Sequence, residues 1–526
     1  MRATPRSLRG MVSAPHHLAA QAGRDVLAEG GSAVEAAVAT AACLAVVYPH
    51  MTGIGGDGFW LVAEPDGRTW AIDGCGAAAM AADRALYRDH ATIPWRGALA
   101  ANTVAGTVAG WQAALAQSGA SLSLDRLLRD AIHHARTGVA VTAGGAQIAA
   151  TVSAALRDLP GDYARIFEPE GRPLAEGDLL RQPALATSLE RLAGEGLDGF
   201  YCGALAQDIA ADLAMLGSPI AAADLAAFAA LPVEPLAVDI TGARLFNLPP
   251  PTQGVASLLI LALFDRLGAG MCDGFDHVHR LVEATKQAFR WRDAHVGDPA
   301  TMTAGAQALL DDKAMLDAMA AAIDPDHAAP WPHPPALGDT TWFGAADARG
   351  QVVSCIQSTY FEFGSGLVLP RTGITWQNRG CSFALDGDGP NRLHPGARPF
   401  HTLNPALARF ADGRVMAYGT MGGEGQPQTQ AAIFTRHAQF GQPLQAAIDA
   451  PRWLLGRTWG DQSTTLKIEA GFDPALYEQL RAAGHAVETV PGWSSMMGHA
   501  GAILRHPGGL LEGATDPRSD GMVATW

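Results

Sequence analysis

The fold of this chain is decided by one stretch, which reads Gly338-Asp339-Thr340-Thr341-Trp342-Phe343-Gly344-Ala345-Ala346-Asp347-Ala348-Arg349-Gly350-Gln351-Val352-Val353-Ser354-Cys355-Ile356-Gln357-Ser358. Two apolar runs, 341–347 and 351–358, flank a short turn that ends in glycine. Such a pattern is typical of a β-hairpin. Five prolines between Asp324 and Pro335 precede it and predict an extended, exposed arm that leads into the first strand.

The turn predicts the register of this hairpin. With a three-residue loop and Gly350 in the left-handed conformation, Asp347 pairs with Gln351. Extending that register to the far end of the hairpin places Ser358 opposite Thr340. A two-residue loop would still leave the two residues adjacent, so a second hydroxyl lies beside Thr340 in either case.

Thr340 has two interpretations. As a good β-former it simply begins a strand. Alternatively, cleavage of the Asp339–Thr340 bond would give Thr340 a free α-amine beside its hydroxyl. An α-amine has a pKa of about 7.7–8.0 and accepts a proton near neutral pH, which is what a threonine hydroxyl needs to act as a nucleophile. The second interpretation predicts a processing site at Asp339 and Thr340.

A threonine nucleophile also needs donors for an oxyanion. The strand-like run 415–418 is followed by Gly419-Thr420-Met421-Gly422-Gly423-Glu424-Gly425. Adjacent glycines after a strand let successive backbone N–H groups converge on one anion. A plain turn is the alternative interpretation of Gly422 and Gly423.

The composition excludes several classes of function. The 526 residues hold 37 basic and 52 acidic side chains, a formal charge of −15, which disfavours nucleic-acid binding. Six scattered cysteines without a CxxC pair argue against disulfides and against a cysteine-based zinc site. The longest apolar run, 36–47, is shorter than the ~20 residues of a membrane span, and no secretory signal is visible. We therefore expect a cytoplasmic protein with reduced thiols.

The rest of the chain predicts mostly helix before residue 339 and mixed strand, loop and short helix after it. Residues 18–47 carry a helical pattern that is broken at Gly30-Gly31, with Ser32 as the cap of the second helix. Helical patterns dominate 106–229, and further helices are expected at 256–267 and 277–293. The chain divides at about residue 339, but neither part looks complete alone.

Two other motifs predict little. Gly53-Ile54-Gly55-Gly56-Asp57-Gly58 matches GxGxxG, but its order is helix, glycines and strand, whereas a dinucleotide site needs strand, glycines and helix. We interpret it as a tight turn close to other backbone. His279 and Glu283 share a helix face, but no third ligand is evident, so an ordinary helix surface is expected. No zinc pattern or serine-hydrolase elbow occurs.

The chain resembles the γ-glutamyltranspeptidase family over nearly its whole length. The resemblance rests on segments that occur in the family's order: Met11-Val12-Ser13-Ala14-Pro15-His16, Gly30-Gly31-Ser32-Ala33-Val34-Glu35-Ala36-Ala37, the glycine motif 53–58, Gly106-Thr107-Val108-Ala109-Gly110, Pro249-Pro250-Pro251-Thr252, Asp339-Thr340-Thr341, Met421-Gly422-Gly423 and Asp516-Pro517-Arg518. It implies an α+β fold, the four-layer αββα sandwich of N-terminal-nucleophile hydrolases.

The resemblance also implies roles for individual residues. A precursor would cleave itself into a large segment, 1–339, and a small segment, 340–526, which stay associated as one composite domain. Thr340 would be the nucleophile, Ser358 its supporting hydroxyl, and Gly422 and Gly423 the oxyanion hole. No metal or other cofactor is implied. The oligomeric state is left open, with a homodimer as one alternative.

The elements that hold a γ-glutamyl group in this family are changed here. The family's carboxylate-binding arginine is missing from Asp73-Gly74-Cys75-Gly76-Ala77-Ala78, and its amine-binding carboxylate is missing from 377–383, where Arg379 appears instead. The family's paired serines are replaced by His401 and Thr402. Losing a buried arginine–carboxylate pair costs on the order of 2–5 kcal/mol of binding, so we do not expect glutathione as the substrate.

These changes lead to three hypotheses about function. Segments 376–383, 425–430 and 249–254 are similar to a bacterial branch of the family that includes oxamate amidohydrolases of purine and allantoin breakdown. The first hypothesis is therefore a self-processing amidohydrolase for a small anionic amide, for example oxamate, with Arg379, His401 and Thr402 binding the substrate. The second is a γ-glutamyl hydrolase, transpeptidase or cephalosporin-acylase-like enzyme. The third is an unprocessed, non-catalytic binding protein.

Overall fold

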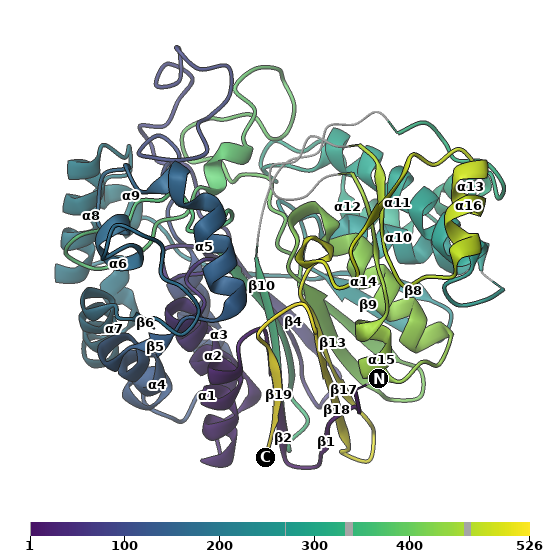
Figure 1. Ribbon diagram of the computed structural model, residues 1–526, viewed down its shortest axis with the longest axis horizontal. Coiled ribbons are helices and arrows are strands. Elements are labelled where there is room, and N and C mark those ends of the chain that lie inside the picture. Colours follow the sequence, from purple (N-terminus) through teal and green to yellow (C-terminus); the bar gives the residue numbers. More distant parts are fainter. Residues whose placement is uncertain (1, 269, 332–339, 457–463) are drawn as a thin grey trace.

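The computed structural model describes residues 2–268, 270–331, 340–456 and 464–526. Two seven-stranded sheets are stacked face to face, and each carries a layer of helices on its outer side (Figure 1). Neighbouring strands of both sheets are antiparallel. The architecture is thus the αββα sandwich that the resemblance implies.

The first sheet contains the hairpin with which the sequence analysis began. Its strands, in spatial order, are β19 (Met522–Thr525), β2 (Gly10–Ala14), β10 (Thr341–Asp347), β11 (Val352–Ser358), β3 (Asp57–Ala63), β4 (Thr69–Gly74) and β7 (Leu231–Val233). The helices on its side are α1 (His17–Ala28), α2 (Ala33–Val47), α3 (Thr107–Ser118), α4 (Leu124–Thr137), α5 (Ala143–Leu156), α6 (Tyr163–Phe167), α7 (Pro183–Glu195), α8 (Ala204–Leu216) and α9 (Ala222–Ala226).

The second sheet carries the glycine turn. Its strands, in order, are β1 (Arg6–Ser7), β18 (Leu511–Thr515), β17 (Ala500–Arg505), β13 (Val415–Thr420), β12 (Ala406–Phe410), β9 (Ala243–Asn247) and β8 (Leu236–Ile240). The helices on its side are α10 (Gly254–Leu267), α11 (Phe275–His295), α12 (Ala306–Asp311), α13 (Lys313–Ala321), α14 (Gln426–Phe434), α15 (Leu444–Asp449) and α16 (Pro474–Ala482). Two small sheets complete the fold: β14 (Trp453–Leu455), β15 (Leu466–Glu469) and β16 (Val487–Val490), and β5 (Val139–Ala140) with β6 (Leu179–Leu180).

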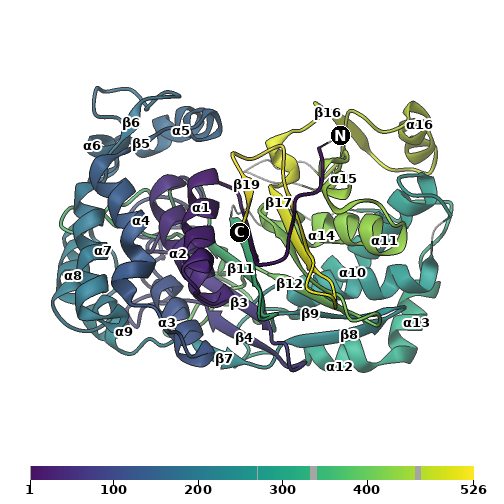
Figure 2. The same ribbon diagram turned by 90° about the horizontal axis from the view of Figure 1, so that it is seen from below.

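The core consists of three apolar layers, one between the two sheets and one between each sheet and its helices. Phe59, Trp342, Ile356, Leu407 and Ile503 belong to the middle layer. Both sheets combine strands from before and after residue 339, and Figure 2 shows these strands interleaved at the centre of the molecule. The two parts of the chain therefore share one core.

The predicted hairpin register is confirmed. Thr341 pairs with Gln357, the Asp347 amide donates to the Gln351 carbonyl at 3.2 Å, and Gly350 has a φ of +102°. The first two helices are also confirmed: the Ser32 hydroxyl caps the amide of Glu35, whose carboxylate accepts from the Ser32 amide.

The prediction that His279 and Glu283 lie on an ordinary helix surface is wrong. The prediction of an exposed proline-rich arm can be compared with the structure only in part. His279 and Glu283 are buried, because His485, in the loop after α16, covers them and hydrogen-bonds His279 at 2.9 Å. The Glu283 carboxylate is paired with Lys286 at 2.6 Å. Residues 324–327 of the proline-rich arm are exposed as predicted. Residues 332–339, including Asp339, lie outside the described residues.

Candidate active site

Thr340 immediately precedes β10 and is buried, as is Ser358 at the end of β11. The last registered pair of the hairpin, Thr341 with Gln357, carries the register to Thr340 opposite Ser358. The Ser358 hydroxyl donates to the Met51 carbonyl at 3.4 Å and accepts from the Tyr360 amide at 2.7 Å. The hairpin therefore brings together the two hydroxyl-bearing residues that the sequence predicted.

The glycine motif 53–58 leads into β3, which pairs with this end of the hairpin in the same sheet. A Cβ at Gly56 would stand 2.1 Å from the Ser358 carbonyl oxygen, and one at Gly55 would stand 2.3 Å from that of Thr375. The motif joins α2 to β3, so the predicted order of helix, glycines and strand is confirmed. These glycines allow close backbone approach behind Ser358, which is the interpretation that the sequence favoured.

The glycine turn after β13 carries the two residues expected to form the oxyanion hole. Gly422 has a φ of +122° and Gly423 a φ of +52°, and the Gly425 amide donates to the Gly422 carbonyl at 2.8 Å. Positive φ values favour glycine at both positions. A Cβ at Gly422 would contact the Gly498 Cα at 3.4 Å, so the turn is packed against the loop that precedes β17.

Trp342 connects the Thr340 strand to this turn. Its indole lies flat against Gly419, where a Cβ would stand only 2.1 Å from the Trp342 Cδ1 atom, and against Gly501, with 2.3 Å to Cζ3. The indole N–H donates to the Ser354 hydroxyl at 2.9 Å. Because side chains are missing at Gly419 and Gly501, β10 packs closely on β13 and β17, and the sheet that carries Thr340 meets the sheet that carries the glycine turn.

Arg379 lies in a short 3₁₀ helix, Arg379–Ser382, and is completely buried. Its guanidinium carbon stands 3.4 Å from the centre of the Tyr360 ring, and its Nη2 donates to the Thr402 hydroxyl at 3.1 Å. Among the described residues, its Nε and Nη1 atoms have no hydrogen-bond partner. A buried guanidinium with unused N–H groups is the feature that an anion-binding site requires.

Gln253 links Thr402, the hydrogen-bond partner of Arg379, to the glycine turn. Its side-chain amide donates to the carbonyls of Thr402, at 2.7 Å, and Gly423, at 2.9 Å. The side-chain oxygen of Gln253 accepts from Arg292 at 2.9 Å. Arg292 is in turn paired with the buried Glu424 at 2.8 Å. The sequence analysis included Gln253 in segment 249–254 but assigned no role to it or to Arg292, because their contacts depend on tertiary packing.

His401 is buried, and both of its ring nitrogens are hydrogen-bonded. The Leu403 amide donates to its Nδ1 at 3.3 Å, which assigns the ring proton to Nε2, and Nε2 lies 2.9 Å from Asp57 Oδ2. Burial, and then the charge of Arg379, lowers the pKa of His401 well below its ordinary value. His401 is therefore a neutral ring at neutral pH, and the cation next to Thr402 is Arg379.

The other oxygen of Asp57 accepts three further N–H groups. Gly76 and Gly106 donate to Oδ1 at 3.1 Å each, and the Gln377 amide donates at 2.9 Å. Burial raises the pKa of Asp57 to about 7, against the opposing effect of these donors and of Arg379. Asp57 was noticed in the sequence only as part of the glycine motif, and nothing in the sequence pairs it with His401.

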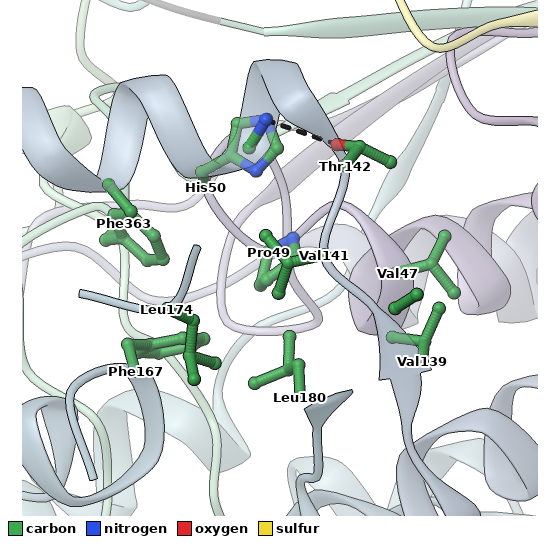
Figure 3. A pocket seen from close by; sticks show the side chains of 13 residues that line it. Val47, Pro49, His50, Val139, Val141, Thr142, Phe167, Leu174, Leu180 and Phe363 are labelled. Carbon is green, nitrogen blue, oxygen red and sulfur yellow. Dashed lines mark hydrogen bonds between the residues drawn. The ribbon is translucent and has the colours of Figure 1, made fainter. Parts of the chain in front are cut away.

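An apolar pocket lies on the other side of the loop that supports Ser358. Figure 3 shows His50 at its edge, with Phe363, Phe167, Leu174, Leu180 and Val139 around it. His50 precedes Met51, whose carbonyl accepts from Ser358. The pocket lining contains no Asp, Glu, Lys or Arg side chain, so it does not offer the charge that an anionic substrate requires.

Comparisons with known proteins place this geometry in context. The family model described as gamma-glutamyltranspeptidase matches residues 19–526. The chain is 53% identical to the oxamate amidohydrolase proenzyme of Klebsiella pneumoniae, over 98% of both chains. It is 40% identical to a glutathione hydrolase-like proenzyme of Bacillus subtilis, also over 98% of both chains.

A solved structure agrees with these sequence matches. The cephalosporin acylase from Bacillus halodurans superimposes with a TM-score of 0.92 at 32% identity, over 100% of this chain and 97% of that one. The match covers both sheets and both helical layers. None of the helices in the described part of the chain combines the length and the hydropathy of a membrane-spanning segment.

Proposed function

Because this chain belongs to the γ-glutamyltranspeptidase family, an enzyme family of N-terminal-nucleophile amidohydrolases, we propose that it cleaves itself before Thr340 and then hydrolyses a small anionic amide. The products of cleavage would be a large segment, 1–339, and a small segment, 340–526. The interleaved strands of both sheets support segments that stay together after cleavage. The relatives named as proenzymes support processing, and family membership disfavours the non-catalytic hypothesis.

In the proposed mechanism, the Thr340 hydroxyl oxygen attacks the amide carbon while the α-amine freed by cleavage accepts the hydroxyl proton. The Gly422 and Gly423 amides donate to the oxyanion. The amine returns the proton to the leaving nitrogen, and an acyl ester on Thr340 remains. Water, activated by the same amine, hydrolyses this ester. Ser358, beside Thr340 in the hairpin, is the supporting hydroxyl.

The proposed substrate class rests on the environment of Arg379. Its unpartnered Nε and Nη1 groups, buried beside Tyr360 and Thr402, suit a carboxylate next to the amide. We propose oxamate, which would give oxalate and ammonia, because it is a small amide with one carboxylate and no α-amino group. The relative that is 53% identical is named for this reaction.

Thr402 and His401 have different parts in this proposal. The Thr402 hydroxyl orients Arg379, and Gln253 ties the Thr402 backbone to Gly423, so the anion site and the oxyanion turn keep a fixed spacing. His401 supports Asp57 rather than contacting the substrate as a cation. Glutathione-type or acylase activity remains the second candidate, since relatives with those names match the full chain.

The expectation of a cytoplasmic enzyme stays a proposal that rests on the cysteines. All six are free, and Cys43, Cys75 and Cys355 are buried. Free thiols are typical of a reducing compartment. A role in purine breakdown depends on the substrate and is tested with it.

The decisive experiment compares two substrates with the purified enzyme. Ammonia release from oxamate is measured beside release of p-nitroaniline from γ-glutamyl-p-nitroanilide. The proposal expects turnover of oxamate and little of the γ-glutamyl compound. Strong turnover of the γ-glutamyl compound with no ammonia from oxamate would favour the second candidate instead.

A further inference from the structure

The buried pair of Asp57 and His401 lies behind Arg379 and is not used by the proposed chemistry. Both side chains are 0% exposed, and they join elements far apart in the chain, the start of β3 and the segment before β12. The link is the 2.9 Å contact from His401 Nε2 to Asp57 Oδ2. Burying the charge of a carboxylate is costly, so the protonation state of Asp57 depends on the groups around it.

The hydrogen bonds around Asp57 influence the charge of its carboxylate. Within the described part of the chain its partners are N–H donors: Gly76, Gly106, Gln377 and His401. Donors favour the ionised carboxylate, whereas burial favours the protonated one. Burial outweighs the donors and raises the pKa of Asp57 to about 7. Asp57 is thus poised to change charge when a neighbouring charge changes.

Arg379 is the charge that Asp57 faces. Each side chain acts electrostatically on the other, and Arg379 also lowers the pKa of His401. With Asp57 ionised and His401 neutral, the positive charge of Arg379 is already compensated. A carboxylate that binds Arg379 then brings a second negative charge into a buried site that holds one cation.

The α-amine that cleavage would free on Thr340 also titrates near neutral pH, and the Asp57→Asn variant below separates its proton from that of Asp57. The buried thiols and the Tyr201 hydroxyl around the site do not relieve this imbalance near neutral pH. Burial raises the pKa of the Cys75 thiol and of the Tyr201 hydroxyl, both of which face Asp57. Burial also raises the pKa of Cys381, beside Arg379 and Arg96, to about 12. Burial raises the pKa of Asp73 to about 6, but Asp73 is paired with Arg398 at 2.6 Å and not with Arg379, and its own variant below serves as the control. Tyr360, whose ring stacks on Arg379, is a further titratable residue beside the site.

We propose that Asp57 is a specificity-determining residue: the Asp57–His401 pair takes up one proton when a monocarboxylate binds Arg379, so that the site accepts one negative charge and no more. The proposal rests on the proposed function, since it takes Arg379 as the anion site. Protonation of Asp57 removes the competing charge, and the substrate carboxylate becomes the partner of Arg379. Hydrolysis of oxamate yields the oxalate dianion, whose second charge has no counterpart in the site, and this favours product release.

The sign of the pH effect follows from linkage. A bound anion raises the pKa of Asp57 further, so binding draws in a proton at any pH where the free carboxyl is ionised. Affinity for the anion therefore falls as pH rises above about 7, by up to about tenfold per pH unit. Below that pH, affinity is independent of Asp57, because the carboxyl is already protonated.

The test is calorimetric titration of the processed enzyme with pyruvate, which has oxamate's shape and carboxylate but no amide to cleave. Titrations in two buffers of different ionisation enthalpy give the number of protons taken up. We expect close to one proton per pyruvate at pH about 8 and close to none at pH about 6. Pyruvate binding with no proton uptake at pH about 8 overturns this inference and leaves the proposed function standing. Failure of pyruvate to bind at either pH contradicts Arg379 as an anion site, and with it both proposals.

Two variants localise the proton. Asp57→Asn cannot ionise, so its uptake at pH about 8 should vanish and its oxamate KM should no longer rise with pH, whatever happens to kcat. Asp73→Asn is the matched control, because Asp73 is also a buried aspartate in an ion pair but does not contact His401. It should keep the wild-type proton uptake.

If Asp57→Asn folds and still takes up the proton, Asp57 is not the acceptor and the inference fails. If it does not fold, the wild-type titrations decide.

Discussion

The guanidinium of Arg379 stacks on the ring of Tyr360, with 3.4 Å from the guanidinium carbon to the ring centre. Tyr360 has a φ of +84°, a conformation that non-glycine residues rarely adopt, and its amide donates to the Ser358 hydroxyl. The aromatic face that supports the cation is thereby tied to the end of the hairpin that carries Ser358. Strain at such a residue is commonly found where a ligand is held.

We first predict the effect of removing this ring. Tyr360→Leu should raise the KM for oxamate about 30-fold, because a desolvated cation–π contact contributes about 2 kcal/mol. Tyr360→Phe keeps the ring and should stay within about threefold of the wild type. Steady-state kinetics check both, and an unchanged KM in Tyr360→Leu would show that the stack does not position Arg379.

Arg379→Gln should lose affinity for the anionic amide while it still cleaves itself. Removing one partner of a buried charge pair costs about 2 kcal/mol or more, which is a KM increase of about 30-fold or more for oxamate. Oxamide, which lacks the carboxylate, is the matched substrate and should be hydrolysed no worse by the variant than by the wild type. Equal losses on both substrates would contradict a carboxylate-binding role.

Gly419→Ala should destabilise the protein, because its Cβ would overlap the buried indole of Trp342 at 2.1 Å. Overpacking of this kind costs about 1–3 kcal/mol and here displaces the strand that leads to Gly422. Gly194→Ala in α7 is the control, since nothing lies within 4 Å of a Cβ there. Thermal unfolding should show a lower midpoint for Gly419→Ala alone; equal midpoints would contradict the close packing.

The Asp516 cluster should determine acid stability. Arg452 and Arg518 lie 2.6 and 3.1 Å from the Asp516 carboxylate and, against the effect of burial, lower its pKa to about 2. A lowered carboxyl pKa stabilises the fold above the unfolded value of about 3.9, and this contribution is lost as pH falls from there towards about 2. Asp516→Asn should cost about 3–5 kcal/mol at neutral pH, because it removes the carboxylate that pairs with the buried Arg452, while Arg518 keeps its ion pair with Glu469.

Thermal unfolding at a series of pH values checks this prediction. The difference in unfolding midpoint between Asp516→Asn and the wild type should become smaller as pH falls from about 3.9 towards about 2. Asp412→Asn, at an exposed pair with Arg414, should cost little at any pH. A difference for Asp516→Asn that is constant with pH would contradict the assignment.

The parts of the site that depend on local sequence could be predicted, and those that depend on distant contacts could not. The Asp347–Gln351 register follows from one turn, so the position of Ser358 opposite Thr340 was predictable. The contact from Asp57 to His401 joins residues on different elements, and no periodicity indicates it. For the same reason, α11 looked like a surface helix, although α16 and its following loop bury His279.

Arg379 lies between these cases. Its presence was visible in the sequence, and a role in binding an anion was expected from its position in a changed segment. What the sequence could not give was its environment: the Tyr360 ring, the Thr402 hydroxyl and the unused N–H groups all depend on tertiary packing. His401 was expected to bind the substrate with Arg379, and the sequence could not show that burial against Asp57 makes it a neutral ring.

The central claim is that Thr340 becomes the N-terminal nucleophile, and the intact mass of the purified protein tests it most directly. The account predicts two polypeptides in the wild type, the smaller of which begins at Thr340, and one uncleaved chain of 54.7 kDa in Thr340→Ala. A wild-type protein that stays intact yet hydrolyses oxamate, or a small fragment that begins at any other residue, would contradict it.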